Sequence, residues 1–337
     1  MMKRSFVLIG IAVMAAALLG MTPTFANKLR LVPSTHFGLA LAARHIKLYL
    51  PVVVQAGKSN SPPSTATPTR TPAPGSDPVI LLTGDSRSGC DAGGTAVAKL
   101  LYTLPTSWPL LFNGDATNSG AYSEFTNCYN TTYGRHKAQI KPVPGNHEYD
   151  TAGGSGYFRY YGSQAGVSGK GYYSFDVGAW HIVALNTEIS HTAGSAEELW
   201  LKSDLAAHVN KCTLAYWHEP RFSSGEHGDN LDMGALWTDL YNANAEVVMN
   251  GHDHDYERFA PQNPSGVADS VRGIREFVVG SGGVAERAFG SIKANSEVRN
   301  NNTWGVLEMT LHASSYDWKF LPVAGGTFTD SGSGTCH

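Results

Sequence analysis

The feature that most constrains this chain is a pattern that occurs five times: a short apolar run leads to a polar residue that can bind a metal ion. Apolar runs of this length, bounded by turn residues, indicate buried strands. The runs are residues 79–83, 109–113, 140–144, 212–217 and 245–250, and they lead to Asp85, Asp115, Asn146, His218 and the pair His252 and His254. The sequence therefore predicts five strands that each end at a potential ligand.

Stretches with helical spacing of apolar side chains lie between these runs. They are residues 96–101, 121–129, 196–207 and 230–241, and Ser195 is placed to cap the third. Strands that alternate with helices predict largely parallel βαβ units. Ligands of such sheets bind beyond the carboxyl ends of the strands, so we expect the polar groups to converge on one crevice.

A glycine precedes the ligand in four of the motifs, at Gly84, Gly114, Gly145 and Gly251. We expect these glycines to let the backbone turn sharply where each strand meets its loop. The ligand types indicate the cation, because two carboxylates, one amide oxygen and three imidazoles suit zinc, manganese or iron better than calcium. Six groups exceed what one tetrahedral ion needs, which indicates two ions that share a carboxylate.

In this order and at these intervals, the motifs resemble those of the calcineurin-like metallophosphoesterase superfamily, and within it the purple acid phosphatase branch. The resemblance extends from residue 78 to the C-terminus, and its most specific parts are Gly-Asn-His-Glu at residues 145–148 and Gly-His-Asp-His at residues 251–254. It implies an α/β fold, a four-layer sandwich of two mixed β-sheets flanked by helices. The runs at 273–280, 304–311 and 315–322 fit antiparallel strands of such sheets.

The resemblance also implies a role for each motif residue. His147 would lie outside the ligand set, where it can protonate or hydrogen-bond the leaving alkoxide. His227, nine residues after His218, is a further candidate for binding phosphate. The implied ligands are Asp85 and His254 for the first ion, Asp115 as the bridge, and Asn146, His218 and His252 for the second ion.

Two positions depart from the family pattern. Two residues after the first aspartate, many members carry a ligand histidine and purple enzymes a glycine, but this chain has Arg87, which cannot coordinate a cation. We expect Arg87 to face substrate phosphate instead. Asn118 stands where purple enzymes have the tyrosine that binds ferric iron. The sequence therefore predicts a colourless enzyme in which Asn118 is at best a weak oxygen ligand.

The expected reaction is hydrolysis of small phosphate monoesters. Two ions of iron, zinc or manganese would lower the pKa of a bound water from about 15.7 towards about 7, so a metal-bridging hydroxide is the expected nucleophile. It would attack phosphorus in line, without a covalent protein intermediate. The nearest alternative is a phosphodiesterase or nucleotidase with the same metals. A non-catalytic surface module that binds a phosphorylated or carbohydrate ligand is the alternative from another class, and Arg87 keeps it open.

The N-terminus predicts export. Two basic residues precede an apolar run at 6–20, and small residues follow up to Ala26, which is the order of a secretory signal. The run is shorter than the about 20 residues that a membrane span needs, so we expect residues 1–26 to be removed without a remaining transmembrane segment. Residues 27–77 combine an apolar segment with a Pro/Ser/Thr-rich linker, and residues 78–337 are the expected catalytic domain. The expected location is secreted or extracytoplasmic.

Charge and cysteine content agree with export. The chain has 25 basic and 28 acidic residues, and removal of residues 1–26 takes away two basic ones, so the net charge changes from −3 to 23 − 28 = −5. Such a chain is not expected to bind nucleic acid stably. The cysteines at 90, 128, 212 and 336 have no C-x-x-C spacing and indicate two disulfides. Three pairings are possible, and of these we favour Cys90 with Cys128 and Cys212 with Cys336.

Overall fold

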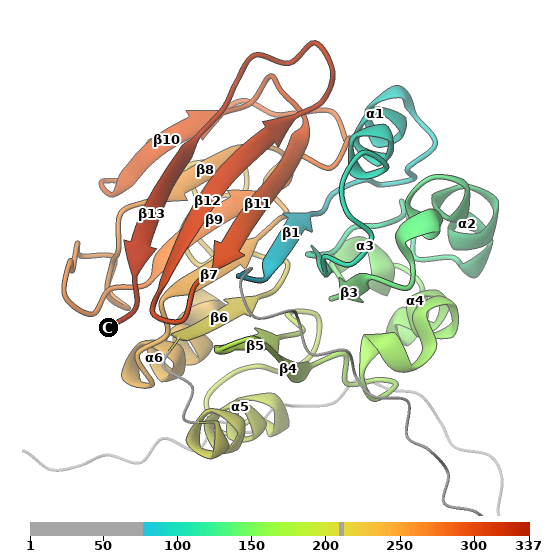
Figure 1. Ribbon diagram of the computed structural model, residues 1–337. Coiled ribbons are helices and arrows are strands. Elements are labelled where there is room, and N and C mark those ends of the chain that lie inside the picture. Colours follow the sequence, from blue (N-terminus) through green and yellow to red (C-terminus); the bar gives the residue numbers. More distant parts are fainter. Residues whose placement is uncertain (1–76, 209–211) are drawn as a thin grey trace, which may run out of the picture. The chain divides into compact units, whose positions relative to one another are not determined.

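Two β-sheets pack against each other, and helices cover the outer side of each (Figure 1). The structure is a computed structural model that describes residues 77–208 and 212–337. The first sheet has the order β13-β12-β11-β1-β2-β3, with β1 Val79–Thr83, β2 Leu110–Phe112, β3 Ile140–Pro142, β11 Gly305–Leu311, β12 Ser315–Pro322 and β13 Ser331–Thr335. The second has the order β10-β8-β9-β7-β6-β5-β4, with β4 Tyr173–Val177, β5 Trp180–Ala184, β6 Cys212–Tyr216, β7 Val247–Asn250, β8 Tyr256–Phe259, β9 Arg275–Val279 and β10 Ser296–Asn300.

The helices form the two outer layers. Those of the first sheet are α1 Ala92–Leu101, α2 Tyr122–Asn127, α3 Asn146–Tyr149 and α4 Ser155–Tyr161, and those of the second are α5 Ala196–Ala207 and α6 Gly234–Asn242. Short 3₁₀ helices precede or follow some of them: η1 Tyr129–Thr131, η2 Tyr133–His136, η3 Ala152–Gly154, η4 Gly162–Ala165 and η5 Leu231–Met233. Ser195 caps α5 as predicted, because its side chain accepts the N–H of Glu198 at 3.2 Å.

Alternating side chains of the strands separate the layers. Ile80 and Leu82 of β1 belong to the core between the two sheets, whereas Leu81 packs with Val97 of α1. This is the period of two that a strand imposes when both of its faces are buried. A third apolar cluster, which includes Trp237 of α6, joins the second sheet to α5 and α6. The four-layer α/β sandwich of two mixed sheets is thereby confirmed.

The predicted strands lie within two residues of their predicted bounds, and one tail prediction needs correction. β11 and β12 are antiparallel to their neighbours as expected. β9 pairs antiparallel with β8 but parallel with β7, so the expectation of an antiparallel strand at 273–280 holds on one side only. β4, β5, β8, β10 and β13 were not predicted from the sequence.

Both favoured disulfides are present. Cys90–Cys128 joins the loop after β1 to the end of α2, and Cys212–Cys336 joins the start of β6 to the C-terminal segment. The predicted signal peptide, the apolar segment at 37–54 and the linker up to residue 76 lie outside the described residues. Among the helices within residues 77–208 and 212–337, none is long and apolar enough to cross a membrane.

Candidate metal centre

The five predicted strand ends meet where the two sheets face each other. β1, β2 and β3 are parallel neighbours in the first sheet, and β6 and β7 are parallel neighbours in the second. Asn113, directly after β2, connects them: its Nδ2 donates to the carbonyl oxygen of Asn250 at 2.5 Å, and its carbonyl oxygen accepts from His218 Nδ1 at 2.8 Å. The polar groups therefore converge from two sheets rather than along the edge of one.

At the sharp turns after the strands, the left-handed backbone conformation occurs at the predicted ligands more often than at the glycines before them. Asp85, Asp115 and His252 have φ values of 59°, 52° and 70°, in the left-handed region that residues with a Cβ rarely adopt. Of the four motif glycines only Gly114 has a positive φ, 102°. At Gly251 a Cβ would instead lie 2.4 Å from Asp85 Oδ2. The other glycines thus provide space, and the strained backbone lies at the ligands, as is common at functional sites.

The predicted ligands of the second ion have their ligand atoms close together. Asn146 Oδ1 lies 3.1 Å from both His218 Nε2 and His252 Nδ1, and His218 Nε2 lies 3.3 Å from Asp115 Oδ1. His218 donates its Nδ1–H to the carbonyl of Asn113, because a carbonyl only accepts, so in the neutral ring the Nε2 lone pair faces this group. The two imidazole nitrogens, 3.2 Å apart, would repel each other without a proton or cation between them.

The predicted ligands of the first ion face each other in the same way. Asp85 Oδ1 and His254 Nε2 are 3.9 Å apart, and both are buried without a hydrogen-bond partner among the described residues. His254 donates its Nδ1–H to the carbonyl oxygen of Ala285 at 3.0 Å, which directs the Nε2 lone pair of the neutral ring towards Asp85. Buried polar atoms without partners are costly, so this pair is suited to hold a cation.

The residues fit two metal ions that share a carboxylate. The ligand atoms of Asp85, Asp115 and His218 lie within 4.8 Å of one another, so Asp115 is close to both groups. The donors are a mixture of carboxylate oxygen, amide oxygen and imidazole nitrogen, which suits zinc, manganese or iron. The assignment of each ligand to one ion stays a prediction.

Burial keeps two of the imidazoles in the form that binds metal. Burial lowers the pKa of His252 to about 3, with a contribution from the positive charges of neighbouring imidazoles. Burial likewise lowers the pKa of His254 to about 4, with contributions from Arg287 and Arg87. Both rings are therefore neutral near pH 7, as metal ligands must be.

The two aspartates have opposite pKa shifts. Burial raises the pKa of Asp85 to about 8, although the positive charge of His218 opposes this. Burial also acts to raise the pKa of Asp115, but the charge of His218 and its hydrogen bond outweigh burial and lower it. For His218 the balance is reciprocal, because Asp115 raises its pKa against the effect of burial. A bound cation would favour both carboxylates in their ionised form and His218 in its neutral form.

His147 lies at the edge of this centre with one ring nitrogen held. Its Nδ1 donates to the carbonyl oxygen of Asn118 at 2.7 Å, and Asp150 Oδ2 lies 3.2 Å away. Its Nε2 is 3.7 Å from Asp115 Oδ2, and 20% of its side chain is exposed. His147 is thus placed to carry a proton at Nε2 beside the predicted bridging carboxylate. Asn118 is itself exposed, and its role as a weak oxygen ligand stays a prediction.

His227 lies next to the predicted ligand His252, and Asp253 holds its ring in place. Its ring packs against that of His252, with centroids 4.1 Å apart and planes tilted by 32°. Asp253 Oδ1 accepts both the backbone N–H and the Nδ1–H of His227, each at 2.9 Å. The structure shows Asp253 fully buried, where it orients the ring whose Nε2 faces the rim.

Arg87 also lies near the predicted first ion. Its backbone N–H donates to the carbonyl of Asp115 at 2.9 Å, and its Nε is buried without a partner among the described residues. Its charge acts on both Asp85 and His254, lowering the pKa of each. The predicted contact between Arg87 and phosphate is consistent with this position and stays a prediction.

Glu148 has a supporting role that the sequence reasoning missed. Its carboxylate is fully buried and accepts the backbone N–H groups of Gly145 at 2.9 Å, Asp115 at 2.9 Å and Thr117 at 3.2 Å. It thereby fastens the loop after β2 to the loop after β3. The signal was available, because a glutamate three residues after Gly145 is placed to bond back to the start of a helix.

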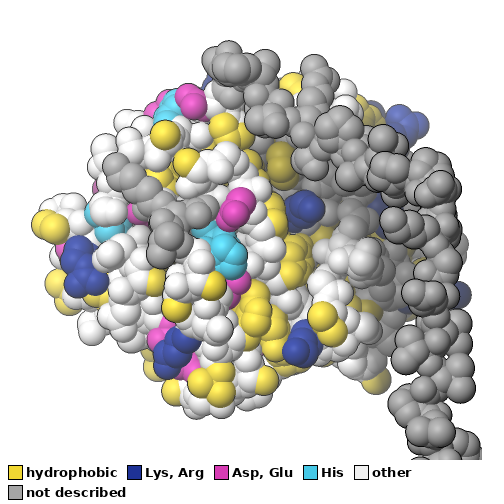
Figure 2. Space-filling view, turned by 60° about the horizontal axis from the view of Figure 1, so that its bottom comes forward, with side chains coloured by type: hydrophobic (Ala, Val, Ile, Leu, Met, Phe, Trp, Pro, Cys, Tyr) yellow, Lys and Arg dark blue, Asp and Glu magenta, His cyan; other side chains and the backbone are white. Residues whose placement is uncertain are grey.

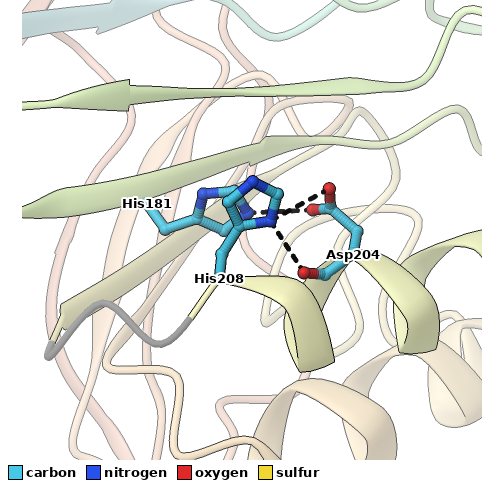
Figure 3. A group of neighbouring side chains, drawn as sticks. All are labelled: His181, Asp204 and His208. Carbon is cyan, nitrogen blue, oxygen red and sulfur yellow. Dashed lines mark hydrogen bonds and ion pairs between the residues drawn. The ribbon is translucent and has the colours of Figure 1, made fainter.

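A second group of potential ligands lies elsewhere, between β4, β5 and α5 (Figure 3). His181 Nε2 is 2.8 Å from Asp204 Oδ2, His181 Nδ1 is 2.9 Å from Asp176 Oδ1, and His208 Nδ1 is 3.3 Å from Asp204 Oδ1. The two imidazoles stack with centroids 4.1 Å apart and planes 14° apart, and both nitrogens of His181 are already paired with carboxylates. We therefore describe this group as an ion-paired cluster. Figure 2 shows that histidine and acidic side chains also lie next to each other on one face of the molecule.

Comparison with known proteins places the chain among phosphoesterases. A model of the calcineurin-like phosphoesterase family matches residues 78–256. Purple acid phosphatase 15 of Arabidopsis thaliana is 33% identical over 135 residues, which are 36% of this chain and 25% of that protein. This match therefore covers only about a quarter of the relative.

Solved structures show the same fold. The purple acid phosphatase PPD1 from yellow lupin (Lupinus luteus) superposes with a TM-score of 0.68 at 18% identity, over 77% of this chain and 53% of that one. GAP50, described as the anchor in the inner membrane complex of Plasmodium, superposes with a TM-score of 0.60 at 16% identity, over 76% and 88%. At these identities the likeness concerns the fold alone.

Proposed function

The chain belongs to the calcineurin-like phosphoesterase family, in its purple acid phosphatase-like branch, and we propose that residues 78–337 form a catalytic domain that hydrolyses small phosphate monoesters. One observation supports this most: the buried ligand atoms of Asp85, Asp115 and His218 lie within 4.8 Å of one another. The proposed ligands of the two ions are Asp85, Asp115, Asn146, His218, His252 and His254, with Asn118 as a weak additional donor.

The side chains have separate tasks in this proposal. The two ions would supply Lewis acidity and an activated water. Asp115 would bridge the two ligand groups, and His218 and His254 are each oriented by a backbone carbonyl that accepts their Nδ1–H. His147, with its Nδ1–H bound to the Asn118 carbonyl, would deliver a proton from Nε2 to the leaving oxygen.

Two positively charged or proton-donating groups would bind the phosphoryl oxygens. Arg87, whose backbone N–H donates to the Asp115 carbonyl and whose Nε is buried without a partner among the described residues, has five N–H donors that suit a phosphoryl group. His227 presents its Nε2 at the rim above His252. We further propose that the protein is exported, because two disulfides are typical of oxidising compartments.

A phosphodiesterase or nucleotidase with the same ligands remains the nearest alternative. These activities differ in the room around the metals and not in the metal ligands, so the test compares a monoester with a diester of the same leaving group. Faster turnover of the monoester supports the proposal, and equal or faster turnover of the diester would exclude it. The binding-module alternative has some support, since GAP50 of similar fold is described as an anchor. It predicts no turnover with either substrate.

The decisive experiment compares the metal-reconstituted chain with Asp115→Asn, using an aryl phosphate and a metal assay on both. Loss of the shared carboxylate is expected to lower kcat/KM more than about 100-fold and to reduce bound metal, because even residues that only orient ligands contribute about 10- to 100-fold. Asp232→Asn, at an exposed aspartate of η5, is the matched control and should retain both. Fully metallated wild-type protein without turnover would refute the phosphatase proposal.

A further inference from the structure

Asp255 is a buried acidic residue that directly follows the predicted ligand His254 and lies outside the proposed ligand set. It is 1% exposed, and both of its carboxylate oxygens are buried without a hydrogen-bond partner among the described residues. No other acidic side chain within residues 77–208 and 212–337 has both oxygens in this condition. Because a buried charge without a partner is costly, this carboxylate needs a proton or a cation.

Glu286 lies next to Asp255 on a neighbouring loop. Two hydrogen bonds align the loops: the backbone N–H of Arg287 donates to the carbonyl oxygen of His254 at 3.1 Å, and the Nδ1–H of His254 donates to the carbonyl oxygen of Ala285 at 3.0 Å. Burial raises the pKa of Asp255, and the charge of Glu286 adds to the rise, as expected for two carboxylates close together. Glu286 Oε1 is itself buried without a partner among the described residues, so three carboxylate oxygens are available in one place.

Two further carboxylates that act on Asp255 already have donors. Asp253 Oδ1 accepts the Nδ1–H of His227 at 2.9 Å, and Glu257 Oε2 accepts the backbone N–H of Ser224 at 2.7 Å. After burial, the charges of these two carboxylates are the largest causes of the raised pKa of Asp255, so the surroundings of this group are negative. A bound cation would relieve this repulsion, whereas a neutral ligand would leave it in place.

The donor atoms favour a different cation from the one that suits the proposed dinuclear centre. The dinuclear ligands mix imidazole nitrogen with oxygen, but Asp255 and Glu286 offer only carboxylate oxygen, which suits hard cations. Ca²⁺ accepts carboxylates through one or two oxygens in a flexible geometry, whereas Mg²⁺ keeps several of its waters. A pair of buried carboxylates therefore fits Ca²⁺ better than Mg²⁺.

We propose that Asp255 and Glu286 bind a third cation, Ca²⁺, which is separate from the two ions of the proposed dinuclear centre. This cation would join the loop after β7, which carries His252 and His254, to the loop after β9. It would thereby hold two predicted ligands in place without contacting substrate. The inference does not depend on the proposed hydrolysis, because its site uses none of the dinuclear ligands and its test measures no turnover.

The test measures Ca²⁺ binding to the full chain, after loading with zinc, by equilibrium dialysis with both metals assayed. Wild type should bind one Ca²⁺ per chain in addition to its zinc, with a Kd on the order of 10⁻⁴ M, as in extracellular Ca²⁺ modules. Asp255→Asn and Glu286→Gln should each weaken Ca²⁺ binding at least about 10-fold with zinc content unchanged, because the charge of the ligands sets the affinity. Asp232→Asn, at an exposed aspartate of η5, is the matched control and should bind Ca²⁺ like the wild type.

Thermal unfolding gives a second readout, which a carboxylate without a cation would not produce. Without Ca²⁺, Asp255→Asn should be at least as stable as the wild type, because a buried charge is removed. Millimolar Ca²⁺ should raise the Tm of the wild type by about 3 °C and leave that of Asp255→Asn unchanged. Two outcomes would overturn the proposal: no Ca²⁺ bound beyond the zinc, which would mean that the pair holds a proton instead, or equal Ca²⁺ affinity in Asp255→Asn and wild type, which would mean an adventitious ion only.

Discussion

Glu148 holds the loops of the metal centre without facing the cleft. Burial raises the pKa of its carboxyl group to about 8, with a contribution from the charge of Asp115, and the hydrogen bonds from the Gly145 and Thr117 N–H groups oppose that shift. The carboxyl group accepts three backbone N–H groups in all. Two of these N–H groups belong to Asp115 and Gly145, in loops that carry predicted ligands. The positions of the ligands therefore depend on a side chain that need not touch metal or substrate.

Replacing Glu148 with Ala should destabilise the fold strongly. Three buried N–H groups lose their acceptor, and each unsatisfied group costs about 1–3 kcal/mol, so we expect the free energy of unfolding to fall by at least about 3 kcal/mol. Urea denaturation measures this. Glu124→Ala, which removes an acceptor from the partly buried Ser119 N–H, is the control and should cost about 1 kcal/mol or less. A similar cost for both variants would contradict the bracing role.

At the scale of elements, His181 joins the β4–β5 hairpin to α5. Its side chain is 1% exposed, and its two nitrogens bond to Asp176 of β4 and Asp204 of α5, with His208 stacked on its ring. Burial lowers the pKa of His181, but the hydrogen bonds to Asp204 and Asp176 outweigh burial and raise it. The protonated ring is therefore the form that connects the hairpin to the helix.

This connection should depend on pH. Since the pKa is raised in the folded state, its stabilisation is complete below the unfolded value of about 6.5 and is lost as pH rises through the folded value. We expect His181→Gln to lower the free energy of unfolding by about 1–3 kcal/mol near pH 5.5 and by clearly less near pH 9. Chemical denaturation of the variant and the wild type at both pH values measures this loss of unfolding free energy. His191→Gln, at a ring that bonds to a backbone carbonyl, should show no such difference. An equal loss at both pH values would mean that the neutral ring suffices.

At the scale of the whole molecule, two disulfides close loops of very different length. Cys90–Cys128 spans 38 residues within the first sheet and its helices. Cys212–Cys336 spans 124 residues and ties the C-terminal segment to the start of β6 in the second sheet. A cross-link stabilises mainly by restricting the unfolded chain, and the restriction grows with loop length.

Removal of the longer bridge should therefore cost more. We expect the double variant Cys212→Ser, Cys336→Ser to lose about 2–4 kcal/mol of unfolding free energy, and Cys90→Ser, Cys128→Ser to lose less. Chemical denaturation of both variants and of the wild type gives the order. Adding a reductant to the wild type should cost at least as much as the larger of the two losses. The reverse order would show that local packing, and not loop closure, decides the contribution.

Local features can be read along the chain: the strands that end at predicted ligands, the span of α5 with its cap, and the candidates for metal ligands. These depend on the period of apolar side chains and on motifs only a few residues long, which are visible along the chain. The two disulfide pairings favoured from the sequence are also those found.

Features that depend on partners far apart in the chain are set by tertiary packing. β9 is parallel to one neighbour and antiparallel to the other because of its place between β7 and β8. Most of the motif glycines are needed because a Cβ at their positions would clash with side chains of neighbouring loops, where the loops of the two sheets meet. Arg287 reaches His227 across 60 residues, and no local period marks such a contact. Hydrophobic spacing predicts which residues are buried, whereas the identity of their neighbours is set only when the sheets and loops pack together.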